Sequence, residues 1–246
     1  MTIQIIPIQI GKDVQAHDDI VDLMLSSQSK PEIQDGDIIV ITQKIISKQE
    51  GSIVNFSQIM PSLLATGIAS EYKKDPRIIQ LILEQTKRIV RMNDGLIIVE
   101  TPHGLVCANA GVDESNIKDG YVTLLPKNSD ESAKKLRQDI QKRTGKKVAV
   151  IISDTFGRPF REGQTNCAIG VSGISSIIDY VGTKDSFGKT LHVTAIAITD
   201  EICSATELVM GKALQIPIAI VRNYKFNNSN DSVTNLIRKK QTDLFR

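Results

Sequence analysis

The stretch DESAKKLRQDIQKRTGKKVAVII, residues 130 to 152, places a helical pattern directly before a strand pattern. The helical pattern covers Asp130 to Arg143, with Ser129 as its expected N-cap and Gly145 at its end. Three apolar residues recur in it at helical spacing: Ala133, Leu136 and Ile140. Val148 to Ile152 then forms a short β-branched run, typical of a buried strand. This succession predicts a fold that combines helices and strands.

Four other short runs rich in Ile and Val are predicted to be strands: Ile38 to Thr42, Leu96 to Glu100, Val193 to Ile198 and Ile216 to Val221. Two more segments have helical character. Asp200 to Leu214 begins with acidic residues and precedes Pro217, and Pro76 opens a segment with an apolar stripe. We therefore predict an α/β or mixed α+β fold.

Length and composition exclude several classes of protein. The 246 residues, 41% hydrophobic and 24% charged, suit one large or two small globular domains. Lys and Arg (30) nearly balance Asp and Glu (28), and only 4% of residues are aromatic, which disfavours nucleic-acid binding. The three cysteines are far apart, and no run of 18 apolar residues occurs. We expect a cytoplasmic protein outside the membrane.

Polar residues gather in the segment IISDTFGRPFREGQT, residues 151 to 165. An apolar strand delivers Asp154 and Thr155 at its expected carboxyl end, and Arg158 and Arg161 follow in a loop that contains Gly and Pro. A carboxylate beside a hydroxyl resembles a Mg²⁺ site, and arginines bind phosphate or carboxylate groups. A solvated loop with surface ion pairs is the alternative interpretation.

Three other segments carry candidate site residues, each with a structural alternative. In VCANAGVDESN, residues 106 to 116, a turn at Gly111 is followed by Asp113 and Asn116, which are also common turn formers. Lys44 and Lys48 stand four residues apart after a strand, so a helix would put both on one face. Glu207 lies in a mostly apolar helical segment, either at its exposed face or as an inward metal ligand. Spacing alone leaves both choices open.

Longer blocks of the sequence resemble one family, the coenzyme F420-0:L-glutamate ligases, also called γ-glutamyl ligases. The blocks occur in the family's order: QKIISKQEG (43–51), YKKDPRIIQLIL (72–83), HGLVCANAGVDESN (103–116), ISDTFGRPFREGQTNCAIG (152–170), DEICSATELVMGKA (200–213) and the closing DLFR (243–246). Neither a GxGxxG nor a Walker A motif is present. The resemblance extends from near the N-terminus to the last residue.

The resemblance implies a two-domain subunit in an intertwined homodimer, with residues 1–85 and 200–246 as the nucleotide-binding domain and 86–199 as a second domain that carries metal-binding loops. The implied reaction is a GTP-dependent ligation. It forms an acyl phosphate on the coenzyme precursor, which L-glutamate attacks to give F420-1, and a second, γ-linked glutamate gives F420-2. GDP and phosphate are released. The implied partners are small molecules only.

The resemblance also implies roles for single residues. Asp113 and Asp154 would hold one divalent ion, Mg²⁺ or Mn²⁺, and Thr155 and Glu207 a second, with K⁺ as a further candidate cation. The implied nucleotide contacts are Gly11, Gln43, Lys44, Lys48, Asn116, Gly211 and Lys212. On chemical grounds we assign Arg158 and Arg161 to phosphate or substrate carboxylate groups and count them, with Asp154, among the catalytic candidates.

Some residues depart from the family pattern. Phe160 stands where Trp is usual, Asn166 and Cys167 replace an Asp-Val pair, Asn223 stands where Gly is usual, and the segment around Gly11 matches poorly. These departures bear on the acceptor pocket, so a ligase that uses another flavin- or pterin-like acid stays an alternative. A second alternative is a nucleotide-binding regulatory protein without catalysis, against which the intact set of proposed metal ligands argues. The sequence does not specify the acceptor, the number of glutamates, the preferred metal or whether the host makes the coenzyme.

Overall fold

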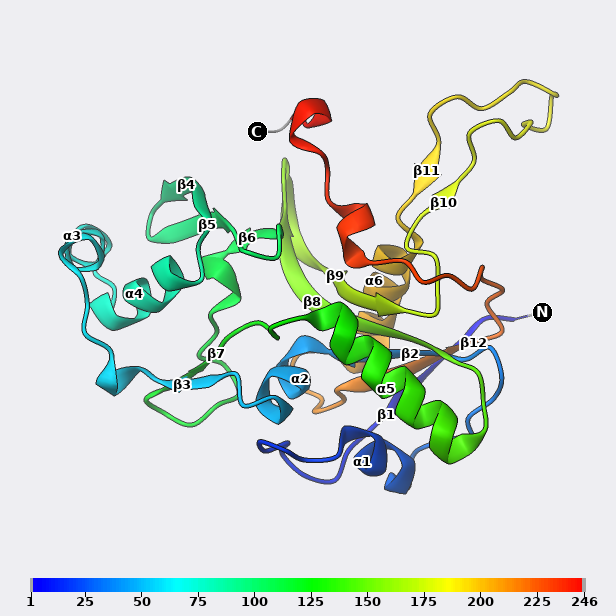
Figure 1. The fold of residues 1–246 in the computed structure, drawn as a ribbon, viewed down its shortest axis with the longest axis horizontal. Helices are drawn as coiled ribbons and strands as arrows, with labels where there is room; N and C mark the ends of the chain where they lie inside the picture. Colours follow the sequence, from blue (N-terminus) through cyan, green and yellow to red (C-terminus); the bar gives the residue numbers. More distant parts are fainter. Residues whose placement is uncertain (1, 245–246) are drawn as a thin grey trace.

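A computed structural model describes residues 2–244, and its largest element is a five-stranded sheet (Figure 1). The strands lie in the order β1 (Gln4–Ile8), β12 (Ile218–Arg222), β2 (Ile38–Thr42), β8 (Ala149–Arg158) and β9 (Arg161–Ser172). Strands β2 and β8 are parallel, and the other neighbours are antiparallel. The whole chain between β2 and β8 therefore forms one crossover connection.

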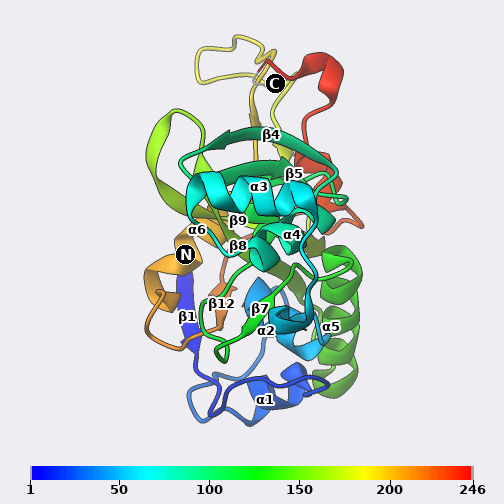
Figure 2. The same cartoon turned by 90° about the vertical axis from the view of Figure 1, so that its left-hand side faces the viewer.

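Helices cover both faces of this sheet. Figure 2 shows α5 and α6 on opposite sides of the strands. The helices of the large lobe are α1 (Ile20–Ser26), α2 (Gln43–Gln49), α5 (Ser129–Thr144) and α6 (Ile198–Met210). In β2, Ile39 and Ile41 pack into the core under α1 and α5, whereas Ile38 and Val40 pack into the core under α6. Burial on both faces explains why this strand is a continuous apolar run.

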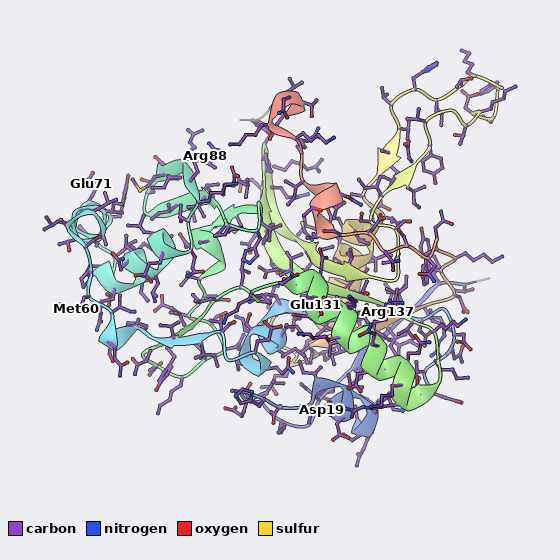
Figure 3. The ribbon with its side chains drawn as sticks, viewed as in Figure 1. Asp19, Met60, Glu71, Arg88, Glu131 and Arg137 are labelled. Atoms are coloured by element: carbon purple, nitrogen blue, oxygen red, sulfur yellow. The ribbon has the colours of Figure 1, made fainter. Side chains whose placement is uncertain are left out.

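A smaller lobe lies within the crossover and has its own core (Figure 1). Its elements are α3 (Leu63–Tyr72), α4 (Pro76–Glu84) and a sheet of β4 (Arg88–Asn93), β5 (Leu96–Glu100) and β6 (Val106–Ala108). The pair β3 (Ile53–Asn55) and β7 (Tyr121–Thr123) connects it to the sheet. Met60 and Glu71 lie on the outer surface of this lobe (Figure 3).

Two β-ribbons leave the main sheet. The strands β8 and β9 continue past the end of β2 as a long hairpin that turns between Arg158 and Arg161. Residues 178–196, here called the arm, project from the body between β10 (Ile178–Asp179) and β11 (Ala195–Ile196) (Figure 1). The 3₁₀ helices are η1 (Phe56–Gln58), η2 (Asn109–Gly111), η3 (Val233–Leu236) and η4 (Lys240–Thr242).

The structure confirms the mixed α/β class and most of the predicted elements. The predicted strands at residues 38–42 and 96–100 have the expected bounds, and Pro76 is the first residue of α4. Helix α5 is also present, but Asn128 rather than Ser129 is its N-cap, since the Asn128 side chain accepts a hydrogen bond from the Glu131 backbone at 3.1 Å. The strand predicted at residues 216–221 forms at 218–222, after Pro217.

Three predicted boundaries are wrong. The strand at residues 193–198 reduces to β11, because Ile198 already begins α6 and Val193 is exposed on the arm. Helix α6 ends at Met210 instead of residue 214, because Gly211 takes a positive φ of 54°. The loop predicted within residues 151–165 is a β-hairpin, so Asp154 and Thr155 lie inside β8 and not at its end.

The domain boundaries at residues 85 and 199 stay a prediction; the main sheet takes strands from both sides of them. Phe245 and Arg246 of the closing DLFR lie outside the described residues. Among residues 2–244, each helix is too short or too polar to cross a bilayer.

Gly170 permits the close contact between β9 and α5. A Cβ atom at this position would lie 2.4 Å from the backbone oxygen of Ser129. We expect Gly170→Ala to lower the free energy of unfolding by about 3 kcal/mol, measured by chemical denaturation, because a backbone atom has to move. Gly67→Ala is the control: Gly67 is exposed in α3 with free space around it, so alanine should stabilise by about 0.5 to 1 kcal/mol. Equal effects of the two changes would contradict this account.

Candidate functional site

The candidate site lies at the carboxyl end of the parallel pair β2 and β8. The last pair in their register is Thr42 with Ser153, after which the chain of β2 enters α2 and β8 continues into the hairpin. Asp154 and Thr155 therefore stand just beyond the end of β2. Ligands of open α/β sheets bind outside the carboxyl ends of the strands, where neighbouring connections diverge.

Lys44 and Asp113 form the first half of the site. Lys44 lies in the first turn of α2, and its Nζ pairs with Asp113 Oδ2 and donates to the backbone oxygen of Ser115 at 3.0 Å. The backbone N–H of Ser115 donates to Asp113 Oδ1 at 2.7 Å. Burial raises the pKa of Asp113, but the hydrogen bonds from Lys44 and Ser115 outweigh it, so this pKa lies below its ordinary value. Asp113 is thus held as a carboxylate beside a cation.

Lys48 lies one turn further along α2, as its spacing predicts, and its side chain is almost fully buried. Its Nζ donates to Asp13 Oδ1 at 2.6 Å, which brings the exposed segment around Gly11 next to α2. Gln43 is also buried, and its Nε2 donates to Ser47 Oγ at 2.6 Å and to the Leu124 backbone at 3.1 Å. The side-chain amide of Gln43 thus joins α2 to the segment after β7.

Four side chains form a ring in the second half of the site. Thr155 Oγ1 and Asn166 Oδ1 are 2.6 Å apart, and Asn166 Nδ2 donates to Glu207 Oε2 at 2.9 Å. Lys212 Nζ donates to Thr155 Oγ1 and lies 3.7 Å from Glu207 Oε1. The Glu207 side chain is only 29% exposed, so it faces this ring and not open solvent. The ring joins β8, β9 and the end of α6.

Asp154 lies between the two halves. Burial raises its pKa to about 6, while the backbone N–H of Thr155, at 2.8 Å from Oδ1, acts in the opposite direction. The charge of Lys212 lowers this pKa, and that of Asp113 raises it. A carboxylate in such surroundings gains strongly from any additional cation.

The hairpin tip carries the two arginines. Arg158 folds back on its own hairpin, with Nη2 on the Glu162 backbone oxygen and Nε donating to that of Gly163 at 3.3 Å. Arg161 and Phe160 are exposed. The structure thus gives Arg158 a role in shaping the tip, and it leaves Arg161 accessible.

Two other predicted nucleotide contacts lie on separate segments. Asn116 lies in the left-handed region (φ 53°) three residues after Asp113, and Gly211 caps α6 next to Lys212.

Carboxylates do not gather into one closed metal cage. Within residues 2–244, no three His, Cys, Asp or Glu side chains lie close enough together to hold a metal ion.

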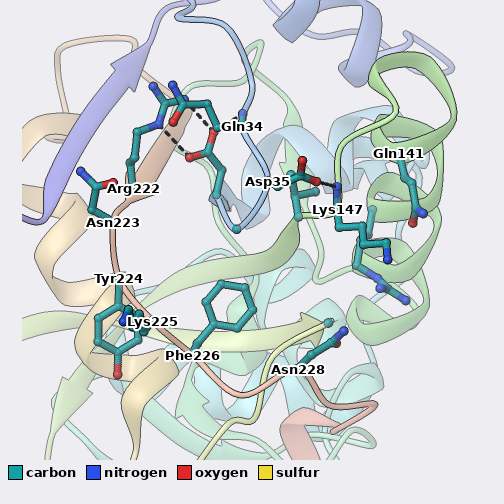
Figure 4. Close-up of a pocket in the computed structure, with 15 residues that line it drawn as sticks. Gln34, Asp35, Gln141, Lys147, Arg222, Asn223, Tyr224, Lys225, Phe226 and Asn228 are labelled. Atoms are coloured by element: carbon teal, nitrogen blue, oxygen red, sulfur yellow. Dashed lines mark hydrogen bonds and ion pairs between the residues drawn. The ribbon is translucent and has the colours of Figure 1, made fainter.

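A cavity of about 720 Å³ lies at the opposite end of the sheet, lined by Lys147, Arg222 and Phe226 among others (Figure 4). Arg222 is used there in an ion pair with buried Asp37, 2.7 Å between Nη2 and Oδ2. This cavity contains no predicted site residue.

Sequence reasoning missed Asn166 as a member of the site and noted it only as a departure from the family pattern. The signal that could have found it is the hairpin register, in which Thr155 pairs with Asn166 and Asp154 with Cys167. Recognition of two strands around the turn between Arg158 and Arg161 would have placed these residues opposite each other. Asp13 and Ser115 were missed as well, and their partners come from distant segments.

The chain was compared with known proteins. The family model for F420-0:gamma-glutamyl ligase matches residues 9–223. A protein of Methanocaldococcus jannaschii named Coenzyme F420:L-glutamate ligase is 50% identical over 87% of this chain and 86% of its own length. Two proteins of the same name match throughout. The one from Methanothermobacter thermautotrophicus is 43% identical over 100% of both chains, and the one from Methanopyrus kandleri is 40% identical over 100% of this chain and 98% of its own length. The chain is therefore a member of the F420-0:gamma-glutamyl ligase family.

Proposed function

We propose that this ligase uses GTP to join L-glutamate to the deazaflavin coenzyme precursor F420-0. The names of the relatives support the coenzyme and glutamate as substrates. The observation that carries the proposal is the site at the end of β2 and β8. There the carboxylates of Asp113, Asp154 and Glu207 lie near the ammonium groups of Lys44 and Lys212, where α2, the hairpin and the end of α6 meet. Phosphoryl transfer needs such a set of charges, since its catalysis is mainly positioning and charge neutralisation.

The residues present fit two divalent cations. Mg²⁺ is usually bound by one or two carboxylates together with substrate phosphates, so a closed cage of protein ligands is not required. Asp113 and Asp154 would hold one ion, and Thr155 and Glu207 the second. All four offer oxygen donors, which Mg²⁺ and Mn²⁺ prefer. When bound, such ions neutralise phosphate oxygens. A K⁺ requirement stays a prediction.

The chain's own side chains have separate tasks in this proposal. The phosphate groups would be contacted by Lys44 of α2, by Lys212 after α6 and, once its ammonium leaves Asp13, by buried Lys48. The nucleotide would be lined by Asn116, Gly11 and Gly211. Gln43 would contribute by holding α2 in position. Arg161 would hold an anionic group of the acceptor at the hairpin tip, and Arg158 would keep the tip in shape.

The reaction then has two steps. A carboxylate oxygen of the acceptor attacks the γ-phosphorus of GTP, the bond to the β-phosphate oxygen breaks, and GDP leaves with an acyl phosphate remaining. The amine of L-glutamate next attacks the acyl carbon, phosphate leaves, and the amine loses a proton as the amide forms. Repetition of both steps on the new glutamate would give the γ-linked F420-2.

The test is mass spectrometry of the protein incubated with GTP, Mn²⁺, L-glutamate and F420-0 or another flavin- or pterin-like acid. We expect one GDP and one phosphate for each glutamate added to F420-0. Trapping with hydroxylamine should give the hydroxamate of the acceptor, because hydroxylamine attacks acyl phosphates. Glutamylation of another acid only would reassign the acceptor, and nucleotide binding without any product would favour a regulatory protein.

The proposal includes a homodimer, since the arm carries apolar side chains in solvent. Phe187 and Val193 are 87% and 89% exposed, and Tyr180 and Val181 are also exposed. A surface of this kind suits a contact with a second copy of the chain. Light scattering in reducing buffer should report about twice the chain mass of 27.1 kDa, and the double change Phe187→Ser and Val193→Ser should shift it toward one chain mass. A wild-type monomer at micromolar concentration would count against this assembly.

A further inference from the structure

We infer that Asn166 is a positioning residue that aims the oxygens of Thr155 and Glu207 at one common cation position. This inference rests on the proposed function, because it concerns the second of the two proposed cation positions. Asn166 is 3% exposed, and both ends of its side-chain amide are occupied inside the protein. Its side chain forms no hydrogen bond with Lys44, Lys48 or Lys212 among those found in residues 2–244.

The direction of each hydrogen bond in the ring follows from chemistry. Ionised Glu207 can only accept, so the amide nitrogen of Asn166 has to face it. The amide oxygen then faces Thr155, and the Thr155 hydroxyl has to donate its proton to that oxygen. The lone pairs of Thr155 Oγ1 are thereby left for a cation, and the ammonium of Lys212 now takes them.

The same argument applies to Glu207. Asn166 holds Oε2, so Oε1 is the oxygen left for a cation, and it lies 3.7 Å from Lys212 Nζ. Lys212 Nζ therefore contacts the free oxygens of both residues, and its own side chain is 65% exposed and able to move away. A single ammonium between two aligned oxygens marks the position that a metal ion would take. One buried amide fixes both donors, as residues behind metal ligands commonly do.

Substitutions at Asn166 separate alignment from charge. Asn166→Ala removes both hydrogen bonds, and Asn166→Leu does so with a side chain of the same branching and the same number of heavy atoms. Asn166→Asp keeps an acceptor for Thr155 but sets a second carboxylate against Glu207, so it should lower the melting temperature without metal and restore or strengthen cation binding. Thr165→Val is the matched control, because the Thr165 hydroxyl joins β9 to Ser204 of α6 at 2.8 Å, and Ser204 in turn donates to the backbone oxygen of Asn166 at 2.9 Å and not to its side-chain amide.

The binding experiment titrates Mn²⁺ into GDP-saturated protein, with free Mn²⁺ read by electron paramagnetic resonance. We expect Asn166→Ala and Asn166→Leu to weaken the second Mn²⁺ by about 10- to 100-fold, and Asn166→Asp and Thr165→Val to bind it at least as well as wild type. If the alanine variant fails to fold, the leucine and aspartate variants still give the comparison. Wild-type affinity in a folded Ala or Leu variant would overturn the inference.

A metal-free measurement distinguishes failure of the inference from failure of the proposed function. In ¹⁵N NMR spectra, the side-chain amide signals of Asn166, identified by their loss in the leucine variant, should exchange slowly and shift in Glu207→Gln. Wild-type protein that binds no Mn²⁺ but shows these signals would overturn the metal assignment and leave the alignment supported. Fast-exchanging signals, unaffected by Glu207→Gln, would overturn the alignment itself.

Discussion

Asp154→Asn is expected to abolish turnover while the protein stays folded. Asp154 lies between the Lys44–Asp113 pair and the ring around Asn166, where the proposed function requires its charge to hold a cation against phosphate oxygens. Removal of charge stabilisation from a phosphoryl-transfer site should raise the barrier by several kcal/mol, or on the order of a thousandfold in rate. The measurement is the initial rate of GDP release with F420-0 and L-glutamate at saturating Mn²⁺.

The same change should leave the melting temperature equal or higher in metal-free buffer. Burial raises the pKa of Asp154 to about 6, so its ionised form is disfavoured in the folded protein, and asparagine removes that cost. Asp94→Asn is the control: Asp94 is exposed in a turn with φ 48°, a conformation that asparagine adopts readily. A variant at residue 154 with near-wild-type turnover would contradict the metal assignment.

The second large effect is expected for Glu207→Gln. Glutamine keeps the shape of the side chain, but it loses the charge that faces Lys212 and the proposed second cation. The Mn²⁺ concentration for half-maximal activity should rise by about tenfold or more, and saturating Mn²⁺ should raise the melting temperature less than in wild type. Both are read from one titration, with activity and thermal unfolding followed in parallel.

Glu201→Gln is the matched control for this titration, since Glu201 lies on the exposed face of the same helix. It should change the free energy of unfolding by no more than about 0.5 kcal/mol and leave the metal dependence unchanged. If the variant at residue 207 behaves like the control in both measurements, Glu207 has no part in cation binding.

Single strands and helices could be predicted where the hydrophobic pattern of the sequence matches the faces that are buried in the fold. The run at residues 38–42 is apolar throughout because both faces of β2 are covered, and such a run has few other interpretations. The outer part of β8 is different: burial falls from half-buried Asp154 to exposed Arg158 along the hairpin, and the polarity of these residues resembles that of a loop. The prediction therefore ended the strand too early.

The members of the site were more predictable than their contacts. The spacing of Lys44 and Lys48 puts them one turn apart if their segment is helical, and residues 43–49 do form α2. The orientation of Glu207 could not be predicted, because a helical pattern gives its angle on α6 but not which strand faces it. Lys48 meets Asp13 and Lys44 meets Asp113 only because distant segments pack together. No local pattern contains that information.

The parallel pairing of β2 with β8 has a consequence for the order of events during folding. Every residue from α2 to α5, including the smaller lobe, has to be made before Ile38 can meet Ala149. Closing so long a loop costs chain entropy and makes this pairing slow compared with the local contacts of α3 with α4. Lys44 and Asp113 both lie within this loop, whereas Asp154 lies on β8 and comes near them only when the closure is complete. During synthesis on the ribosome, the smaller lobe can thus form its core early, whereas the candidate site is complete only after α6 and Lys212 have been made.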